Sequence, residues 1–338
     1  MKAGLELEYW TVDGNGELVS CRELADSFDF SEQEFVEPLF EIKTGPRSDP
    51  EELIDSVREK IERSVEKAEE LGLHIVPLGT PLNSGEIEAV DSERGRIQQE
   101  IIGEDLRAAE RVAGTHVHFE KEDVAEQLNR LTAIDPALAL MNSSPYYQGE
   151  RLGSSSRNLV YRYRCYSEFP GHGQLWSFVD SVEEWDRRID ERFREWISAA
   201  EKEGIDRETV REHFRPEDAL WTPVRLRKQF PTVEWRSPDT SLPSNLFQLV
   251  RDLFRVMESD VELPEFEELK DLSREAMEDG LTREVRGYLE DAGFETDSYR
   301  IYAEEVAGEE EIGIEEARKK RLDAARELRE DLGLGQFP

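Results

Sequence analysis

The stretch GLELEYW, residues 4–10, alternates apolar and polar side chains and predicts a β-strand with two different faces. Leu5, Leu7 and Tyr9 lie on one face, whereas Glu6 and Glu8 lie on the other. An apolar strand face packs against a core, so we expect the two carboxylates to project together from the opposite side of a sheet.

Three further segments repeat this alternation. They are FVEPLFEIK (35–43), GTHVHFE (114–120) and PTVEWRS (231–237). Their polar faces carry Glu37, Glu41 and Lys43 in the first, His116, His118 and Glu120 in the second, and Glu234 and Arg236 in the third. Four strands with the same pattern predict one sheet whose polar face is the candidate site.

Helical patterns separate these strands. We expect helices over residues 48–72, 92–111, 122–141, 177–203, 244–260, 264–279 and 310–332. Ser48 or Asp49 caps the first of them, Pro50 suits its first turn and Gly72 ends it. The pattern predicts the α+β class: a largely antiparallel sheet, helices on its apolar face and a concave polar face. We expect one domain over 1–338, with catalytic motifs in 4–242 and a mostly helical portion over 243–338.

The composition is strongly acidic, with 78 Asp and Glu against 43 Lys and Arg and a formal net charge of -35. Such a charge argues against nucleic acid as a partner and indicates a high-salt cytoplasm, as in a halophilic archaeon. A protein that merely tolerates acidity is the alternative. Two distant cysteines suit a reducing cytoplasm. Neither a leader nor a membrane-length apolar run is recognisable, so we expect neither export nor a membrane partner.

The acidic strand residues suit a metal site. Glu6, Glu8, Glu41 and Glu234 offer the hard oxygen ligands that Mg²⁺ prefers, with Mn²⁺ also possible. His116 and His118 stand out because the chain has only five histidines. Zinc bound by histidine and glutamate is an alternative, as are a structural histidine pair and a solvated acidic face.

Arginines gather in SSPYYQGERLGSSSRNLVYRYRCY, residues 143–166. Arg151, Arg157, Arg162 and Arg164 lie in it, and Arg236 stands two residues after Glu234. Arginine suits recognition of phosphate or carboxylate, so Arg151, Arg157 and Arg236 are candidate nucleotide contacts; charge compensation is the alternative. The chain lacks a P-loop, a dinucleotide-binding GxGxxG and a GxSxG elbow, so any ATP site would have to bind the phosphates without these motifs.

Five motifs occur in order along the chain: GLELEYW, EPLFEIKTGP, GTHVHFE, ALALMNSSPYYQGERLGSSSR and PTVEWRSPDT. Over residues 4–260 this set resembles the second family of glutamate-cysteine ligases, the carboxylate-amine ligases. The resemblance implies a fold similar to glutamine synthetase catalytic domains and guanidino kinases. It also implies metal or metal-nucleotide positions at Glu6, Glu8, Glu41, His116 and Glu234, and a phosphate or substrate contact at Arg236, with Arg157 as a second such contact.

The implied reaction activates the glutamate γ-carboxylate with ATP and Mg²⁺, and the amine of cysteine then attacks the acyl phosphate to give γ-glutamylcysteine. Glu41 and Arg236 are the expected catalytic pair. Two departures from the family pattern are Leu7, where a middle acid is usual, and Lys43, where asparagine is usual. Two alternatives remain: a ligase for another carboxylate or amine, and a non-catalytic acidic protein that binds divalent cations. Small molecules are the expected partners, and a homo-oligomer is possible.

Overall fold

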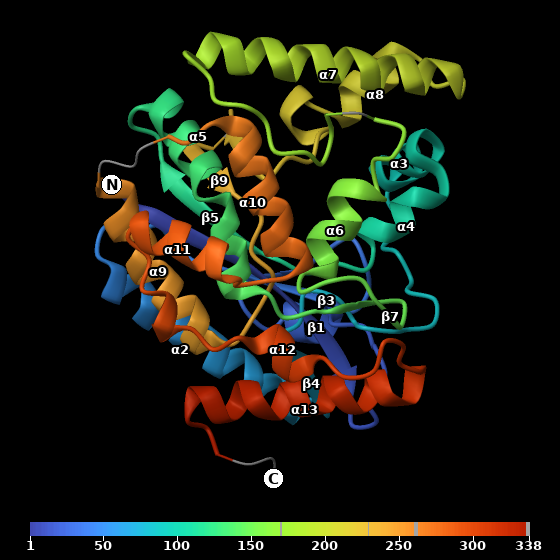
Figure 1. Cartoon of the computed structure of the whole chain (residues 1–338). Coiled ribbons are helices and arrows are strands. Elements are labelled where there is room, and N and C mark those ends of the chain that lie inside the picture. Colours follow the sequence, from blue (N-terminus) through green and yellow to red (C-terminus); the bar gives the residue numbers. More distant parts are fainter. Residues whose placement is uncertain (170, 229, 260–262, 336–338) are drawn as a thin grey trace.

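The computed structural model of the chain describes residues 1–169, 171–228, 230–259 and 263–335 (Figure 1). Within these residues the main sheet runs in the order β2-β3-β1-β5-β9-β8, and β4 also pairs with β1. Its strands are β1 Ala3–Asp13, β2 Ser31–Gln33, β3 Leu39–Lys43, β4 Leu73–Val76, β5 Thr115–Glu120, β8 Val224–Arg227 and β9 Thr232–Trp235. Every pairing between these strands is antiparallel, which confirms the predicted α+β class with a largely antiparallel sheet.

The register of the strands brings the predicted polar residues together. Glu6 on β1 lies opposite His116 on β5, and Glu8 lies opposite Glu41 on β3. His118 on β5 in turn lies opposite Glu234 on β9. Because directly opposed residues project to the same side of a sheet, these side chains share one face across four adjacent strands.

The other face of the sheet packs on the main hydrophobic core. Leu5, Leu7 and Tyr9 are fully buried there with apolar residues of helices α2 (Pro50–Glu70) and α9 (Pro243–Glu258). The predicted cap of α2 is Asp49, whose side chain accepts hydrogen bonds from the backbone of Glu51 and Glu52. Helices therefore cover the apolar face, as expected from the alternation in residues 4–10.

Two smaller cores lie at opposite ends of the molecule. In Figure 1, α13 (Ile314–Leu332) crosses one end, whereas α7 (Val182–Lys202) and α8 (Arg207–His213) lie at the other. Helix α13 packs on the far end of β1, where Trp10 and Val12 are buried. The α7 end has its own aromatic core around Trp196, next to α3 (Glu93–Ile102) and α6 (Ser156–Tyr163). The polar face opens between these two ends.

The predicted strand over residues 35–43 was too long. Strand β3 begins only at Leu39, because residues 37 and 38 form a turn and Pro38 has no backbone N–H for a ladder. Val36 makes a single bridge to Ala89 instead. The hairpin partner β2 and the edge strand β8 were not predicted at all.

Two predicted helices are interrupted. The helix expected over 92–111 divides into α3, a 3₁₀ turn (Gly103–Asp105) and α4 (Leu106–Ala109), since Gly103 adopts a φ of 71°. The helix over 122–141 becomes α5 (Val124–Ala133) followed by a 3₁₀ segment (Asp135–Met141), where Pro136 cannot continue an α-helix.

The C-terminal portion is helical where it is described. It contains α9, α10 (Phe266–Glu278), α11 (Arg283–Asp291), α12 (Tyr302–Val306) and α13. The predicted helix 244–260 corresponds to α9, and its last residue lies outside the described residues. The predicted portion 243–338 likewise includes residues 260–262 and 336–338, which lie outside them. No helix in the described ranges combines the length and the apolar character needed to cross a membrane.

The remaining short elements are α1 (Arg22–Ala25), the 3₁₀ turns Pro216–Asp218 and Thr296–Ser298, and the strand pair β6 (Tyr146–Tyr147) and β7 (Glu150–Arg151).

Candidate functional site

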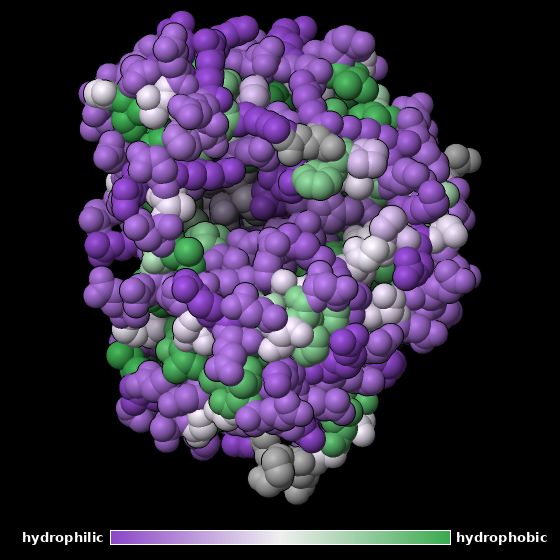
Figure 2. Space-filling model, turned by 180° about the vertical axis from the view of Figure 1, so that it is seen from behind, coloured by the Kyte–Doolittle hydropathy of each residue, from purple (hydrophilic) through white to green (hydrophobic). Residues whose placement is uncertain are grey.

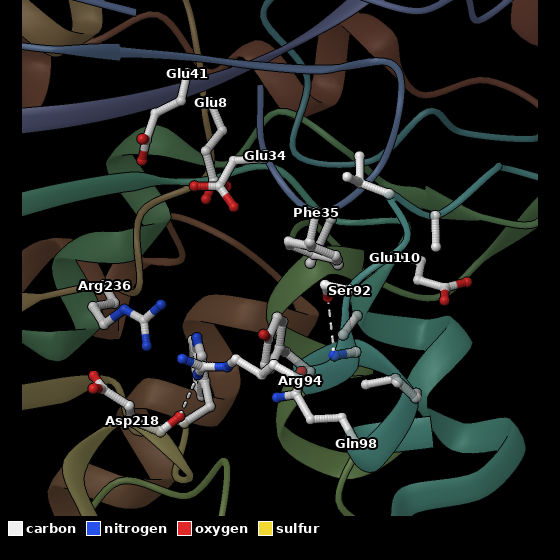
Figure 3. Close-up of a pocket in the computed structure, with 18 of the residues that line it drawn as sticks. Glu8, Glu34, Phe35, Glu41, Ser92, Arg94, Gln98, Glu110, Asp218 and Arg236 are labelled. Atoms are coloured by element: carbon white, nitrogen blue, oxygen red, sulfur yellow. Dashed lines mark hydrogen bonds between the residues drawn. The ribbon is translucent and has the colours of Figure 1, made fainter. Parts of the chain in front are cut away.

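A cavity of about 820 Å³ opens on the polar face of the sheet. Figure 2 shows the molecule from this side, with a hollow in a surface of mostly hydrophilic residues. The sheet contributes Glu6, Glu8, Glu41, His116, Arg225 and Arg236 to its lining. Figure 3 shows Glu8, Glu34 and Glu41 converging on one side, with Arg236 facing them from the other. The cavity therefore has an acidic wall and a basic wall.

The acidic wall contains carboxylates and imidazoles close enough to share a cation. The Oε2 of Glu6 lies 3.5 Å from His116 Nδ1 and 3.2 Å from His118 Nε2. His116 Nδ1 is also 3.7 Å from Glu234 Oε1, and its Nε2 is 4.0 Å from Glu8 Oε1. Among the described residues, three groups place ligand atoms within 4.8 Å of one another: Glu6, Glu41 and His116; Glu6, His118 and Glu234; and Glu8, Glu34 and Glu41. Oxygen-rich groups of this kind fit Mg²⁺ or Mn²⁺.

Glu234 is fully buried and held by arginines. Its Oε2 accepts a 2.8 Å hydrogen bond from Arg225 Nε and lies 2.7 Å from a terminal nitrogen of the same guanidinium, and its Oε1 lies 3.1 Å from Arg236 Nε. Burial is the largest single effect and would raise the pKa of Glu234, but the charge of Arg225 and those of further neighbours such as Arg236 together outweigh it and hold the pKa well below its ordinary value. Glu234 thus stays ionised, with Oε1 directed toward the two histidines.

Glu8 and Glu41 experience the opposite effect. Glu8 accepts a 2.6 Å hydrogen bond from the Gly114 N–H, yet burial and the neighbouring Glu34 carboxylate raise its pKa to about 8. Burial, followed by Glu34 and Glu6, raises the pKa of Glu41 well above its ordinary value. Carboxylates that repel one another in a buried place are stabilised in their ionised form by a bound cation.

Glu34 was missed by the sequence analysis. It follows β2 directly and precedes the turn at residues 37 and 38, in a segment without an alternating pattern. The hairpin between β2 and β3 brings it back over Glu8 and Glu41. The signal that could have revealed it is the turn itself, because Glu37 and Pro38 allow β2 to fold back along β3.

His116 is suited to bind a metal. Burial, and next the charge of Arg236, lower its pKa to about 4, so its imidazole is neutral at neutral pH. A neutral ring has a free lone pair, which a metal ion requires.

The basic wall is formed by arginines from α6, β8 and the end of β9. Arg157 is 1% exposed, and its guanidinium donates to the carbonyl oxygens of Ser237 at 3.0 Å and Arg236 at 3.1 Å. Arg236 lies 5.6 Å from the ring centre of Trp221, which stacks on Tyr161. Arg157 and Arg236 both line the cavity.

The structure does not bring Arg151 to the site. Arg151 is exposed on β7, and it is absent from the lining that the described residues form. Arg164 is also distant and lies 3.7 Å from Glu150, whereas Arg162 is buried in an ion pair with Asp135 at 2.9 Å. Arg225 and Arg227 take the place of these residues at the cavity. They were missed because VRLR, residues 224–227, is too short to be identified as a strand.

Of the other residues on the predicted polar faces, His118 lies at the site, whereas Glu37 and Glu120 make contacts elsewhere. His118 belongs to the cluster through Glu6 and Glu234. Glu37 instead accepts hydrogen bonds from Ser20 and Gln33 in the turn. Glu120 forms an exposed ion pair with Lys2 at 3.2 Å.

Comparison with known proteins gives one family. Residues 3–330 match the model of Glutamate-cysteine ligase family 2 (GCS2). No curated protein sequence matches the chain significantly.

Two solved structures share its fold. A bifunctional glutathione synthetase from Pasteurella multocida superposes with a TM-score of 0.58 at 16% identity, covering 98% of this chain and 52% of that protein. A glutamate–cysteine ligase from Francisella tularensis in complex with AMP gives a TM-score of 0.58 at 11% identity, covering 100% of this chain and 95% of that one. The chain thus spans about half the length of the Pasteurella protein and nearly all of the Francisella protein.

Proposed function

Since the chain belongs to glutamate-cysteine ligase family 2, a family of ATP-dependent carboxylate-amine ligases, we propose that it joins glutamate to cysteine to form γ-glutamylcysteine. The observation that supports this proposal is the convergence of Glu6, Glu8, Glu41, His116 and Glu234 on one cavity that Arg157 and Arg236 also reach. A cavity of about 820 Å³ has room for a nucleotide and a small amino acid together.

Magnesium is the proposed metal, held by Glu6, Glu8, Glu41, His116 and Glu234. Three overlapping ligand groups among the described residues are compact enough to hold a cation, which supports this proposal. When bound, Mg²⁺ supplies the positive charge that neutralises phosphate oxygens during phosphoryl transfer. Each of these groups has at least two carboxylates and at most one histidine, whereas catalytic zinc sites usually have two or three histidine or cysteine ligands, so the donor atoms favour Mg²⁺ or Mn²⁺.

The proposed reaction has two bond exchanges. An oxygen of the glutamate γ-carboxylate attacks the γ-phosphorus of ATP, the bond to the β-phosphate oxygen breaks, and ADP leaves. The cysteine amine then attacks the acyl carbon, loses a proton, and releases phosphate as the carbon–oxygen bond breaks. Charge develops on phosphate oxygens in both steps, and electrostatic stabilisation of such charge is usually the largest catalytic contribution.

Arg236 and Arg157 are the groups placed to meet that charge. Arg236 is oriented by its contact with Glu234, and Arg157 by the two backbone carbonyls that it contacts. Both side chains are thus fixed before substrate arrives, which lowers the cost of reorganisation in the transition state. Arg236 would contact the transferred phosphoryl group, and Arg157 a neighbouring phosphate or carboxylate.

The test is ADP release, measured in about 2 M KCl with Mg²⁺, ATP and a panel of amino acids. Glutamate with cysteine is expected to release ADP well above the rate with ATP alone, and the product is identified by mass as γ-glutamylcysteine. If another carboxylate and amine pair releases ADP while glutamate and cysteine do not, the ligase class stands and this substrate assignment fails. Metal binding without turnover for any pair would favour a non-catalytic cation-binding protein.

The cellular location that we propose is the cytoplasm. Cys21 and Cys165 are both buried as free thiols, which suits a reducing compartment.

A further inference from the structure

Lys43 places a positive charge inside the acidic wall. It is the last residue of β3, projects to the same face as Glu41 two residues earlier, and lies opposite Glu6 on β1. Its Nζ is 2.8 Å from Glu41 Oε2 and 2.5 Å from Glu32 Oε1. One ammonium group therefore bridges a carboxylate of the cluster and a carboxylate at the rim of the cavity.

The two partners differ in exposure. Glu41 is 2% exposed, whereas the side chain of Glu32 is 55% exposed on the edge strand β2. The Lys43 side chain is itself 39% exposed. It donates a hydrogen bond to Glu32, whereas Glu41 Oε2 accepts no hydrogen bond from the described residues and contacts the ammonium as an ion pair.

Glu41 belongs to two of the three ligand groups, as Glu6 also does. It belongs both to the group with Glu6 and His116 and to the group with Glu8 and Glu34. A carboxylate has two oxygens, and Lys43 already contacts one of them. A divalent ion that used both oxygens of Glu41 would have to displace the ammonium.

A lysine ammonium is charged at neutral pH, because its ordinary pKa is about 10.4. Lys43 therefore presents a cation to the two carboxylates that it contacts, Glu41 and Glu32.

We propose that the Lys43 ammonium competes with a divalent cation for Glu41. The side chain of Lys43 then occupies a place beside Glu41 that a metal ion would otherwise take. The inference rests on the proposed metal cluster and concerns how many divalent ions, and how tightly, the cluster binds. Its physical basis is that an ammonium and a metal ion cannot both occupy the space beside one carboxylate oxygen, and like charges repel there.

The test is Mn²⁺ binding, measured by titration with detection of free Mn²⁺ by electron paramagnetic resonance, without nucleotide and at fixed high KCl. Lys43→Met removes the charge and keeps the length of the side chain. We expect this variant to bind one more Mn²⁺ per chain than the unmodified protein, or to bind its weakest ion at least tenfold more tightly. Lys43→Arg keeps a cation in place and should behave like the unmodified protein.

Two controls make the result specific. Lys67→Met removes a lysine paired with Glu70 on the surface of α2, so it changes the net charge equally but away from the cluster. In the double variant Lys43→Met with Glu41→Gln, the gain should disappear, because it depends on Glu41.

Equal Mn²⁺ stoichiometry and affinity in the unmodified protein and in Lys43→Met would overturn this inference, as would an equal gain in Lys67→Met. An unmodified protein that binds no Mn²⁺ at all would instead refute the metal cluster of the proposed function. The two failures are therefore distinguishable without any measurement of turnover.

Discussion

The carboxylates at this site differ in how strongly their surroundings favour the ionised form. Glu234 is kept ionised by Arg225 together with further neighbours such as Arg236, whereas burial and neighbouring acids disfavour ionisation of Glu8 and Glu41. The sheet therefore places the ionised carboxylate of Glu234 on β9 beside Glu8 on β1 and Glu41 on β3, whose ionisation is unfavourable. Divalent cations that bind there reduce the repulsion between these carboxylates, so their binding should stabilise the folded chain.

We expect Glu41→Gln and Glu234→Gln each to lower kcat by roughly 10²- to 10³-fold, the range found when one electrostatic contact of a reacting group is lost. Each change keeps the volume of the side chain but removes a ligand charge. The measurement is ADP release together with circular dichroism, which should show a retained fold. Glu120→Gln, on the exposed end of the same sheet, is the matched control and should keep full activity. Wild-type turnover in both site variants would refute the assignment.

Asp239 gives a prediction for pH. It is fully buried, accepts hydrogen bonds from Ser155 at 2.9 Å and from the Ser143 N–H at 3.2 Å, and has a pKa raised to about 6 by burial. Between about pH 4 and pH 6 the folded chain holds a proton that the unfolded chain has released, so the free energy of unfolding falls as pH rises through this window. The size of this loss is about 3 kcal/mol for a shift of about two pKa units.

Asp239→Asn cannot ionise, and its free energy of unfolding should fall less steeply between about pH 4 and pH 6. Urea unfolding at fixed KCl across this range measures both slopes. Parallel slopes in the two proteins would show that the native carboxyl titrates normally.

At the scale of elements, the backbone of Gly114, just before β5, lies very close to the side chain of Arg157 from α6. A Cβ added to Gly114 would overlap the Arg157 guanidinium and lie only 2.5 Å from its Cζ. Gly114 also donates its N–H to Glu8. This glycine therefore lets an arginine of α6 lie against the sheet while its backbone orients a carboxylate of the acidic wall.

Gly114→Ala should displace Arg157 and reduce kcat by at least about tenfold, because misplacing a charged group in a preorganised site is costly. Gly14→Ala is the matched control, since a Cβ there meets nothing within 4 Å. The two variants are compared by ADP release and thermal unfolding. Equal activity in both would mean that Arg157 adjusts freely.

The elements also show what sequence can predict. The strands carrying Glu6, Glu8, His116 and Glu234 were predicted because their alternation is regular and their apolar faces are buried. Strand β8 and the hairpin over Glu34 were missed, because their positions depend on pairing with distant strands and not on a local pattern. Arg151 was misplaced for the same reason: β6 and β7 direct it outward, and nothing in its neighbouring sequence reveals that direction.

For the whole molecule, a net charge of -35 is the dominant electrostatic fact. Self-repulsion at this charge weakens the compact state at low ionic strength, because the Debye length at about 0.01 M salt is near 30 Å and shrinks to about 3 Å at 1 M.

We expect the midpoint of thermal unfolding to rise by at least about 10 °C between about 50 mM and 2 M KCl, and activity after refolding to require the higher salt. Comparing KCl with equimolar sucrose separates charge screening from general exclusion of cosolutes. Full stability and activity at about 50 mM KCl would refute a high-salt adaptation.

The pairing order of the sheet finally bears on how the chain is made. Strand β1 is synthesised first, yet it lies between β3 and β5, and β5 pairs with β9 from residue 232 onward. Glu6 and Glu8 therefore leave the ribosome long before Glu234 and the arginines that balance them. Until β9 emerges, the nascent chain carries an incomplete sheet with an unpaired β5 edge and an uncompensated acidic face. Repulsion between such incomplete chains would hinder their aggregation. The negative charge that destabilises the finished fold at low salt would thus reduce aggregation during synthesis.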